Sequence, residues 1–450
     1  MEIELKIIPF IFIEMKKILL ICFLFSSLGV FSQTTKEEVL SDLNRTGGVY
    51  YAYPGPKGKQ TPTPKGYEPF YISHFGRHGS RYLISDNDYL RVAKLLSKAD
   101  EANALTPLGR SLKDRLDTLM IETSGRGGDL SPLGVRQHRE IAERMFYNYP
   151  QVFNGKDIDV EARSTLVVRC VLSMAAFTER LKELNPALKV TRESSNRYMP
   201  YLNYWTDESD KYRTNGEYGK ELYRKFKERH TNPERITTSI FSDKDFIEKN
   251  VNPSDFMWDL YWLASDAQNV ETPISFYDLF TPDELFDLWQ VFNYDFYVNC
   301  SNYKGNKGIR VANSKPVLRN IIETADSIIE SGNNSVSLRF GHDGNIVPLA
   351  AIMRLNDCYN SIDEPNKFYE AFSDWKIAPM AANIQMIFFK NKKNPKDIIV
   401  KFLLNEEEKT LPISSEIAPY YPWSDVRNFF NTILEAPDEM LTNPNLGVAL

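Results

Sequence analysis

Residues 71–82 read Tyr-Ile-Ser-His-Phe-Gly-Arg-His-Gly-Ser-Arg-Tyr, and this stretch decides both the fold and the chemistry. The apolar residues Phe70 and Ile72 predict a β-strand that leads into His78. His78 lies between Arg77 and Arg81 and is followed by glycine, which lets the backbone come close to a ligand. Because arginine presents a planar charged fork that matches phosphate oxygens, the stretch predicts an imidazole directed at an anion.

The chemistry of this arrangement follows from the charges around His78. A neutral imidazole is a competent nucleophile toward phosphorus, and flanking guanidinium groups favour that neutral form because they oppose a second positive charge. The same groups would stabilise the charge on a transferring phosphoryl group. The alternative is an ordinary histidine beside two solvated arginines, since short motifs also occur by chance.

A second predicted strand, at Ile158 and Val160, runs into Arg163 before a helix. The apolar residues of that helix recur every three or four positions at Leu166, Cys170, Met174, Phe177 and Leu181. Arg163 therefore lies at a strand-to-helix turn, where free backbone N–H groups and the helix dipole favour anions. Taken alone, an ordinary surface arginine is the alternative, because most arginines are exposed.

A third turn follows the predicted half-buried strand at residues 335–340, whose apolar and polar side chains alternate. His342 and Asp343 come directly after this strand and before an apolar helix at residues 346–355. Ligands of open α/β sheets bind outside the carboxyl ends of the strands, so the three turns converge if their strands are neighbours.

The composition excludes several other classes of protein. The chain has 450 residues, 42% of them hydrophobic and 25% charged, with a formal net charge of -6, which gives no basic excess for nucleic-acid binding. No spacing of cysteine or histidine indicates a zinc site, so we expect chemistry without a metal or other cofactor. Three cysteines lie outside the N-terminal segment, and a bridge between Cys300 and Cys358 is left open.

The N-terminal 32 residues are predicted to be a signal segment. Lys16 and Lys17 precede an apolar run at residues 18–24, and a small-residue cleavage site ends at Ser32. Translation could begin at Met15. A membrane anchor is the alternative, but the apolar run is short for a span. We therefore expect a periplasmic or secreted bacterial protein without a stable membrane span after cleavage.

The remainder is predicted to be an α/β core with a mixed central sheet, helices on both faces and a mostly helical cap. The core would comprise residues 33–192 and 331–450, and the aromatic-rich segment 193–330, with weak strand signals, would form the cap. Helices are predicted at residues 88–102 and 105–120, and Ser131 is predicted to cap a helix that has Pro132 in its first turn.

Taken together, the three ordered motifs make the chain similar to the histidine acid phosphatases, branch 2 of the histidine phosphatase superfamily. The motifs are Arg77-His78-Gly79-Ser80-Arg81, Arg163-Ser164-Thr165 and His342-Asp343. The resemblance covers about residues 51–429. The opening motif and the residues Tyr-Tyr-Pro-Trp at 420–423 resemble most the multiple inositol polyphosphate phosphatases.

The resemblance implies a role for each matching residue. His78 would be the nucleophile that becomes phosphohistidine, and Asp343 would protonate the leaving oxygen. The phosphate oxygens would be bound by Arg77, Arg81, Arg163 and His342. At the second motif the inositol polyphosphate group usually has His-Ala-Glu, whereas His342-Asp343-Gly344 matches the bacterial phytase and glucose-1-phosphatase pattern.

The expected function is therefore metal-independent hydrolysis of small phosphate monoesters, favouring inositol polyphosphates such as phytate. A broad acid phosphatase acting on sugar phosphates is the alternative enzyme. A catalytically silent protein that binds phosphorylated ligands is an alternative of a different class, although such a protein would not need a proton donor at Asp343.

Overall fold

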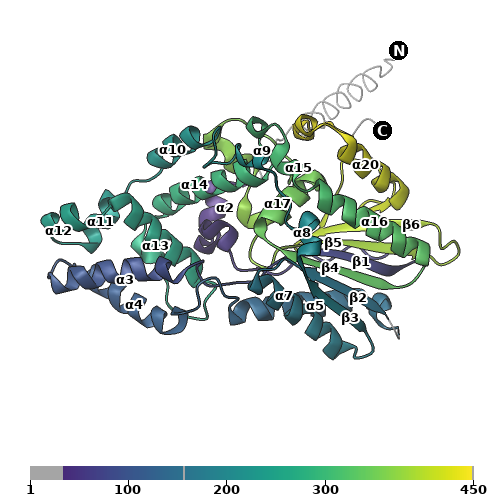
Figure 1. The fold of residues 1–450 in the computed structure, drawn as a ribbon, viewed down its shortest axis with the longest axis horizontal. Helices are drawn as coiled ribbons and strands as arrows, with labels where there is room; N and C mark the ends of the chain where they lie inside the picture. The colour runs from purple at the N-terminus through teal and green to yellow at the C-terminus, as the bar shows by residue number, and fades with distance from the viewer. Residues whose placement is uncertain (1–33, 156–157, 448–450) are drawn as a thin grey trace, which may run out of the picture. The chain divides into compact units, whose positions relative to one another are not determined.

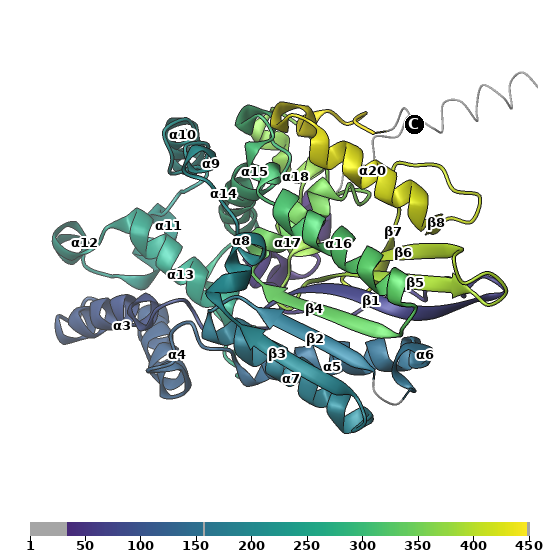
Figure 2. The same cartoon turned by 45° about the vertical axis from the view of Figure 1, so that its right-hand side comes forward.

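One mixed β-sheet forms the framework of the protein and lies toward the right in Figure 1. The computed structural model describes residues 34–155 and 158–447, so the predicted signal segment lies outside the described residues. The strands are β1 (Tyr67–Arg77), β2 (Asp159–Ser164), β3 (Lys189–Ser194), β4 (Ser335–Gly341), β5 (Asn383–Asn391), β6 (Ile398–Leu404), β7 (Glu407–Lys409) and β8 (Tyr420–Pro422). Their order is β3-β2-β4-β1-β5-β6-β7, with β8 paired to β6 (Figure 2). The predicted mixed sheet is confirmed.

The order of the strands brings the three predicted turns to one edge of the sheet. β4 pairs in parallel with β1 on one side and with β2 on the other, and β3 pairs in parallel with β2. β5 is antiparallel to β1. In this register Arg77 pairs with Gly341, and Ser164 pairs with Phe340. Because parallel neighbours end at the same edge, the loops after β1, β2 and β4 lie side by side.

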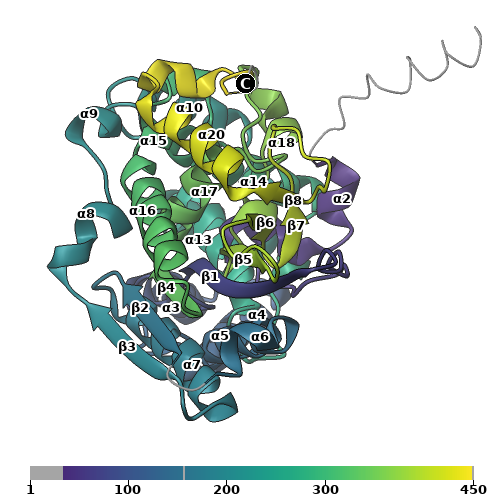
Figure 3. The same cartoon turned by 90° about the vertical axis from the view of Figure 1, so that its right-hand side faces the viewer.

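Helices cover both faces of the sheet, as Figure 3 shows in a view from one end. One face is covered by α5 (Pro132–Asn148), α6 (Pro150–Phe153) and α7 (Val168–Leu184), and the other by α16 (Lys315–Ser331), α17 (Asp343–Ile352) and α20 (Trp423–Glu435). All seven residues of β4 are buried. The prediction of a half-buried strand was wrong here, because β4 lies between β1 and β2 with helices over both of its faces.

A helical part extends to one side of the sheet (Figure 1). It contains α9 (Asp207–Asp210), α10 (Lys220–Arg229), α11 (Glu234–Ile240), α12 (Lys244–Asn250), α13 (Pro253–Ala267), α14 (Pro282–Cys300) and α15 (Ile309–Ala312). The short helix α8 (Met199–Leu202), which precedes them, packs against β4. As predicted, the described segment between β3 and β4 consists of helices and loops. Two helices that were predicted to belong to the core, α3 (Asp86–Glu101) and α4 (Pro107–Thr123), pack instead against α13 and α11. Conversely, α16 was placed in the cap but packs against β1 and α20.

The remaining helices are short and lie near the chain ends or before β5. They are α2 (Lys36–Leu40), α18 (Phe368–Ala371) and α19 (Asp374–Ile377), and a 3-10 segment, η1 (Leu43–Tyr50), follows α2. Cys300 and Cys358 are free thiols, so the bridge left open by the sequence is not formed. Among the described residues no helix is both long and apolar enough to cross a membrane.

Several local predictions are confirmed by the structure. The Ser131 hydroxyl caps α5 by accepting a hydrogen bond from the N–H of Gly134. Residues 392–397, which are rich in lysine, connect the antiparallel strands β5 and β6. Strand β3 was not predicted, because Val190 is its only large apolar residue and most of its side chains are exposed.

Candidate active site

His78 is the first residue after β1 and is only 2% exposed. Its Nδ1 atom lies 2.9 Å from the carbonyl oxygen of Gly79. A carbonyl oxygen can only accept a hydrogen bond, so a neutral His78 carries its proton on Nδ1. The lone pair of Nε2 is thereby left available for attack on an electrophile.

Two helices hold the loop that carries His78. A Cβ atom on Gly79 would lie 2.5 Å from the carbonyl oxygen of Gly134 in the first turn of α5, so only glycine fits without a shift of the backbone. The Gly79 N–H donates to the hydroxyl of Ser173 on α7, and the Ser80 N–H donates to the side-chain oxygen of Gln137 on α5. The backbone of the loop that carries His78 is therefore held in place by α5 and α7.

Arg77 and Arg81 present buried guanidinium groups on either side of the loop. Arg77 Nη1 donates to the carbonyl oxygens of Val49 and Ala378, and its Nη2 forms an ion pair of 2.7 Å with Asp343. The Arg81 guanidinium lies 4.7 Å from the ring centre of Tyr50. The buried Nε atoms of Arg77 and Arg81 have no hydrogen-bond partner within the described residues. Unpartnered buried donors of this kind suit a bound anion.

Arg163 has different surroundings from Arg77 and Arg81. Its side chain, 26% exposed, forms ion pairs with Glu161 and Glu193, and its guanidinium lies over the ring of Tyr198. The structure thus places Arg163 in an ion-pair cluster at the end of β2, because the side chain leaves β2 next to the carboxylates of Glu161 and Glu193. The sequence had predicted that Arg163 lies with Arg77 and Arg81 and binds phosphate with them.

Arg169, which the sequence analysis missed, lies with His78 instead. It is in the first turn of α7, its charge acts on His78, Arg81 and Asp343, and its buried Nε has no described hydrogen-bond partner. A signal was present in the sequence. A cation in the first turn of a helix opposes the helix dipole, so an arginine at this position calls for a functional reason.

His342 and Asp343 lie at the N-terminus of α17. The ring centres of His342 and His78 are 5.7 Å apart, and His342 Nε2 lies 3.2 Å from the hydroxyl of Thr165. The His342 N–H donates to the side-chain oxygen of Asn345, which fixes the first turn of the helix. The side chain of Asp343 is 23% exposed, so it reaches both Arg77 and the solvent side.

The electrostatics keep both histidines neutral. Burial lowers the pKa of His78 well below its usual value, and the charges of the three arginines lower it further. Burial also lowers the pKa of His342 to about 4, against the opposing effect of Asp343. Burial raises the pKa of Asp343, but the charges of Arg77, His342 and Arg81 and the hydrogen bond from the Gly344 N–H together outweigh burial, so that the pKa lies below the usual value. Without ligand, Asp343 is therefore an ionised partner of Arg77 at neutral pH.

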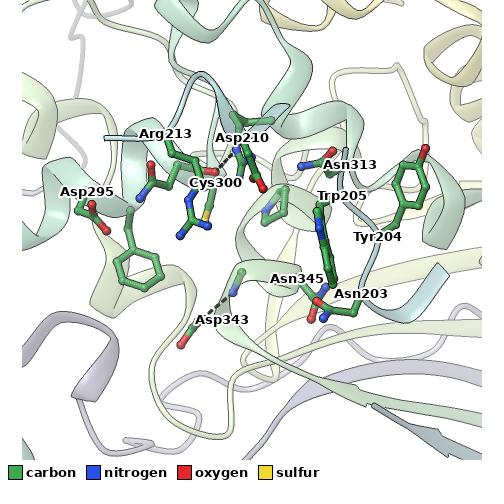
Figure 4. A pocket seen from close by; sticks show the side chains of 15 residues that line it. Asn203, Tyr204, Trp205, Asp210, Arg213, Asp295, Cys300, Asn313, Asp343 and Asn345 are labelled. Atoms are coloured by element: carbon green, nitrogen blue, oxygen red, sulfur yellow. Dashed lines mark hydrogen bonds and ion pairs between the residues drawn. The ribbon is translucent and has the colours of Figure 1, made fainter. Parts of the chain in front are cut away.

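A cavity of about 380 Å³ opens beside Asp343 (Figure 4). Its floor is formed by the first turn of α17, and its walls come from α14, α15 and the loops around α9 in the helical part. Within the described residues no three histidine, cysteine or acidic side chains are grouped so that they could hold a metal ion.

This arrangement places the imidazole of His78, buried guanidinium groups and the carboxyl group of Asp343 close together, beside a cavity with room for a ligand. The model of the histidine phosphatase superfamily, branch 2, matches residues 76–405, which include both the His78 and the Asp343 loops. The chain belongs to this family. As a branch 2 histidine phosphatase, it is a phosphomonoester hydrolase.

Solved structures show the same fold. A multiple inositol polyphosphate phosphatase of Bifidobacterium longum, in complex with inositol hexasulfate, matches with a TM-score of 0.71 and 16% identity, over 86% of this chain and 97% of that chain. The phytase of D. castellii matches with a TM-score of 0.61 and 16% identity, over 92% of this chain and 89% of that one. No curated protein matches this histidine phosphatase.

The two arginines of the β2–α7 region offer a matched test of the anion site. We expect Arg169→Met to lower kcat by about 10²–10³-fold, because removing one donor to developing negative charge has an effect of this size. Arg163→Met also removes one guanidinium group, but from a partly exposed ion-pair cluster, and it is expected to leave kcat nearly unchanged. Steady-state kinetics with an aryl phosphate measures both. A larger loss in the Arg163 variant would restore that residue to the phosphate site.

Proposed function

We propose that this histidine phosphatase is an exported, metal-independent phosphomonoesterase that hydrolyses inositol polyphosphates through a phosphohistidine at His78. The observation that carries the proposal is the position of His78, whose Nε2 lone pair is free and whose charge environment combines three arginines with Asp343. Export is proposed from the pattern of residues 16–32 alone.

In the first step the phosphate group of the substrate binds among Arg77, Arg81 and Arg169. The negative phosphate offsets the charge of Arg77, so the pKa of Asp343 rises and its carboxyl group takes a proton. His78 Nε2 attacks phosphorus, the bond between phosphorus and the leaving oxygen breaks, and the Asp343 carboxyl group donates its proton to that oxygen. The products are an alcohol and phosphohistidine.

In the second step water replaces the alcohol. The Asp343 carboxylate accepts a proton from the water, whose oxygen attacks phosphorus. The phosphorus–nitrogen bond breaks, inorganic phosphate leaves, and His78 returns to its neutral form. The hydrogen bond from Nδ1 to the Gly79 carbonyl persists throughout and keeps the ring in place.

Inositol polyphosphates are favoured because the His78 motif resembles that of the multiple inositol polyphosphate phosphatases. The structural neighbours with this fold bear that name or the name phytase, which supports the choice of substrate class. Sugar phosphates remain the second candidate, because His342-Asp343-Gly344 resembles the second motif of the glucose-1-phosphatase group.

The experiment is a measurement of phosphate release by the purified protein between acid and neutral pH. The substrates are inositol hexakisphosphate, inositol 1,4-bisphosphate, glucose 1-phosphate and 4-nitrophenyl phosphate, each with and without a chelator. We expect chelator-resistant release, with the highest kcat/KM for an inositol phosphate. Preference for glucose 1-phosphate would select the second candidate. Absence of release from every ester would contradict the proposed activity.

A further inference from the structure

The cavity beside Asp343 is placed to receive the part of the substrate that leaves with the ester oxygen. Asp343, Gly344 and Asn345 form one side, and Figure 4 shows Trp205 and Arg213 on other sides of the same space. Its volume of about 380 Å³ suits a small phosphorylated ring. The indole of Trp205 is 53% exposed and offers a flat apolar wall.

Most charged groups that line this cavity already have partners. The guanidinium of Arg310 forms an ion pair of 3.0 Å with Asp210 and donates from Nε to the Asn299 carbonyl oxygen. The carboxylate of Asp343 is paired with Arg77, and Asp295 accepts a hydrogen bond from the hydroxyl of Thr214. The guanidinium group of Arg310 is therefore already engaged and is not free to bind a ligand.

Arg213 differs from them. It lines the cavity, yet no hydrogen bond or ion pair within the described residues engages its guanidinium group. Its backbone is nevertheless fixed, because its N–H donates to the Asp210 carbonyl oxygen and its own carbonyl oxygen accepts from Gly216. In Figure 4, Arg213 lies across the cavity from Asp343. Arg213 is exposed, and its charge acts on Asp295 in the same cavity. A guanidinium group without a hydrogen bond or ion pair in the wall of this cavity can receive a second anion.

We propose that Arg213 binds a second phosphate group on the leaving part of the substrate. The proposal rests on the proposed function and narrows its substrate class. Because Asp210 and Asp295 line the same cavity, further phosphate groups would be brought close to carboxylates. The preferred substrate is therefore a ring polyol with two or three phosphate groups, rather than a fully phosphorylated ring.

The test compares esters that differ in the second phosphate. The full-length protein is assayed with inositol 1-phosphate, inositol 1,4-bisphosphate, inositol hexakisphosphate and 4-nitrophenyl phosphate. We expect the KM for the bisphosphate to be about tenfold lower than that for the monophosphate, as one charge-assisted contact predicts. In Arg213→Gln the KM for the bisphosphate should rise to the value for the monophosphate, while its kcat changes little. Arg213→Lys should recover part of the difference.

Lys211→Gln is the matched control. Lys211 lies two residues away and pairs with Glu208, and it does not line the cavity, yet its replacement removes the same net charge. We expect the control to keep the low KM for the bisphosphate, which separates a direct contact from a general change in charge.

The outcomes distinguish this inference from the proposed function. Turnover of all esters with equal KM values for the mono- and bisphosphate would overturn the role of Arg213 and leave the phosphatase intact. An Arg213→Gln effect of equal size on 4-nitrophenyl phosphate would also overturn it, because that ester has no second phosphate. The highest kcat/KM for the hexakisphosphate would contradict the limit on phosphate number. Absence of turnover on every ester would overturn both proposals.

Discussion

Replacement of His78 by alanine is expected to abolish turnover of every phosphate ester while phosphate binding survives. The variant loses the atom that attacks phosphorus in the first step of the proposed reaction, and loss of a catalytic nucleophile typically lowers kcat by about 10⁵–10⁶-fold. The arginines that hold the anion remain, since Arg77 is fixed by the carbonyl oxygens of Val49 and Ala378. Phosphate release measures turnover, and thermal stabilisation by inorganic phosphate measures binding.

A direct observation of the intermediate completes this test. Rapid quenching in alkali, with a substrate labelled in the phosphate, should leave label on the native protein and none on the alanine variant. His74→Gln is a suitable control, because His74 is buried on the same strand and packs between Phe177 and Phe340. Label on the alanine variant would show that another residue is the nucleophile.

Asp343→Asn is expected to affect substrates according to their leaving groups. For alkyl esters such as inositol phosphates, kcat/KM should fall by about 10²–10⁴-fold, because the alkoxide leaves poorly without a proton. For 4-nitrophenyl phosphate the value should change little, since that leaving group needs no proton and kcat/KM reports only the first chemical step. Asp343→Glu keeps the carboxyl group and should restore part of the activity on alkyl esters. Equal losses on both kinds of ester would exclude Asp343 as the acid.

The pH dependence of the same two proteins gives a second readout. The pKa of His78 lies well below 6.5, so the imidazole stays neutral and nucleophilic into the acid range. The pKa of Asp343 lies below its usual value in the free enzyme, so its protonated fraction declines as pH rises. We therefore expect kcat/KM for alkyl esters to be highest below neutral pH and to fall as pH rises. Asp343→Asn should remove that fall, and an alkaline optimum in the native enzyme would contradict the assignment.

The sequence predicted the framework of the site because its signals are local. Each signal is a short pattern in which a strand is followed by site residues, as in Arg77-His78-Gly79 after one strand and His342-Asp343 after another. Because the two strands are parallel neighbours, both groups of residues lie at the same edge of the sheet. The structure places His78, Arg77, Arg81, His342 and Asp343 together, as predicted.

Two features of the structure could not be predicted from local sequence patterns. The choice between Arg163 and Arg169 depends on where each side chain leaves the β2–α7 turn, and the carboxylates of Glu161 and Glu193 that engage Arg163 become neighbours only in the sheet. Likewise, α3 and α4 were assigned to the core because periodicity gives a helix and its apolar face, but not the element against which that face packs. Both depend on contacts distant in sequence.

The central position of β4 has a consequence for how the chain folds. β1, near the start of the described residues, pairs on one edge with β4 and on the other with β5, both from the last third of the chain. The pairing that sets His78 beside His342 thus closes a loop containing the whole helical part, and such distant pairings form slowly. A nascent chain that ends before β4 has the nucleophile but no finished site, so hydrolysis can begin only after synthesis is almost complete.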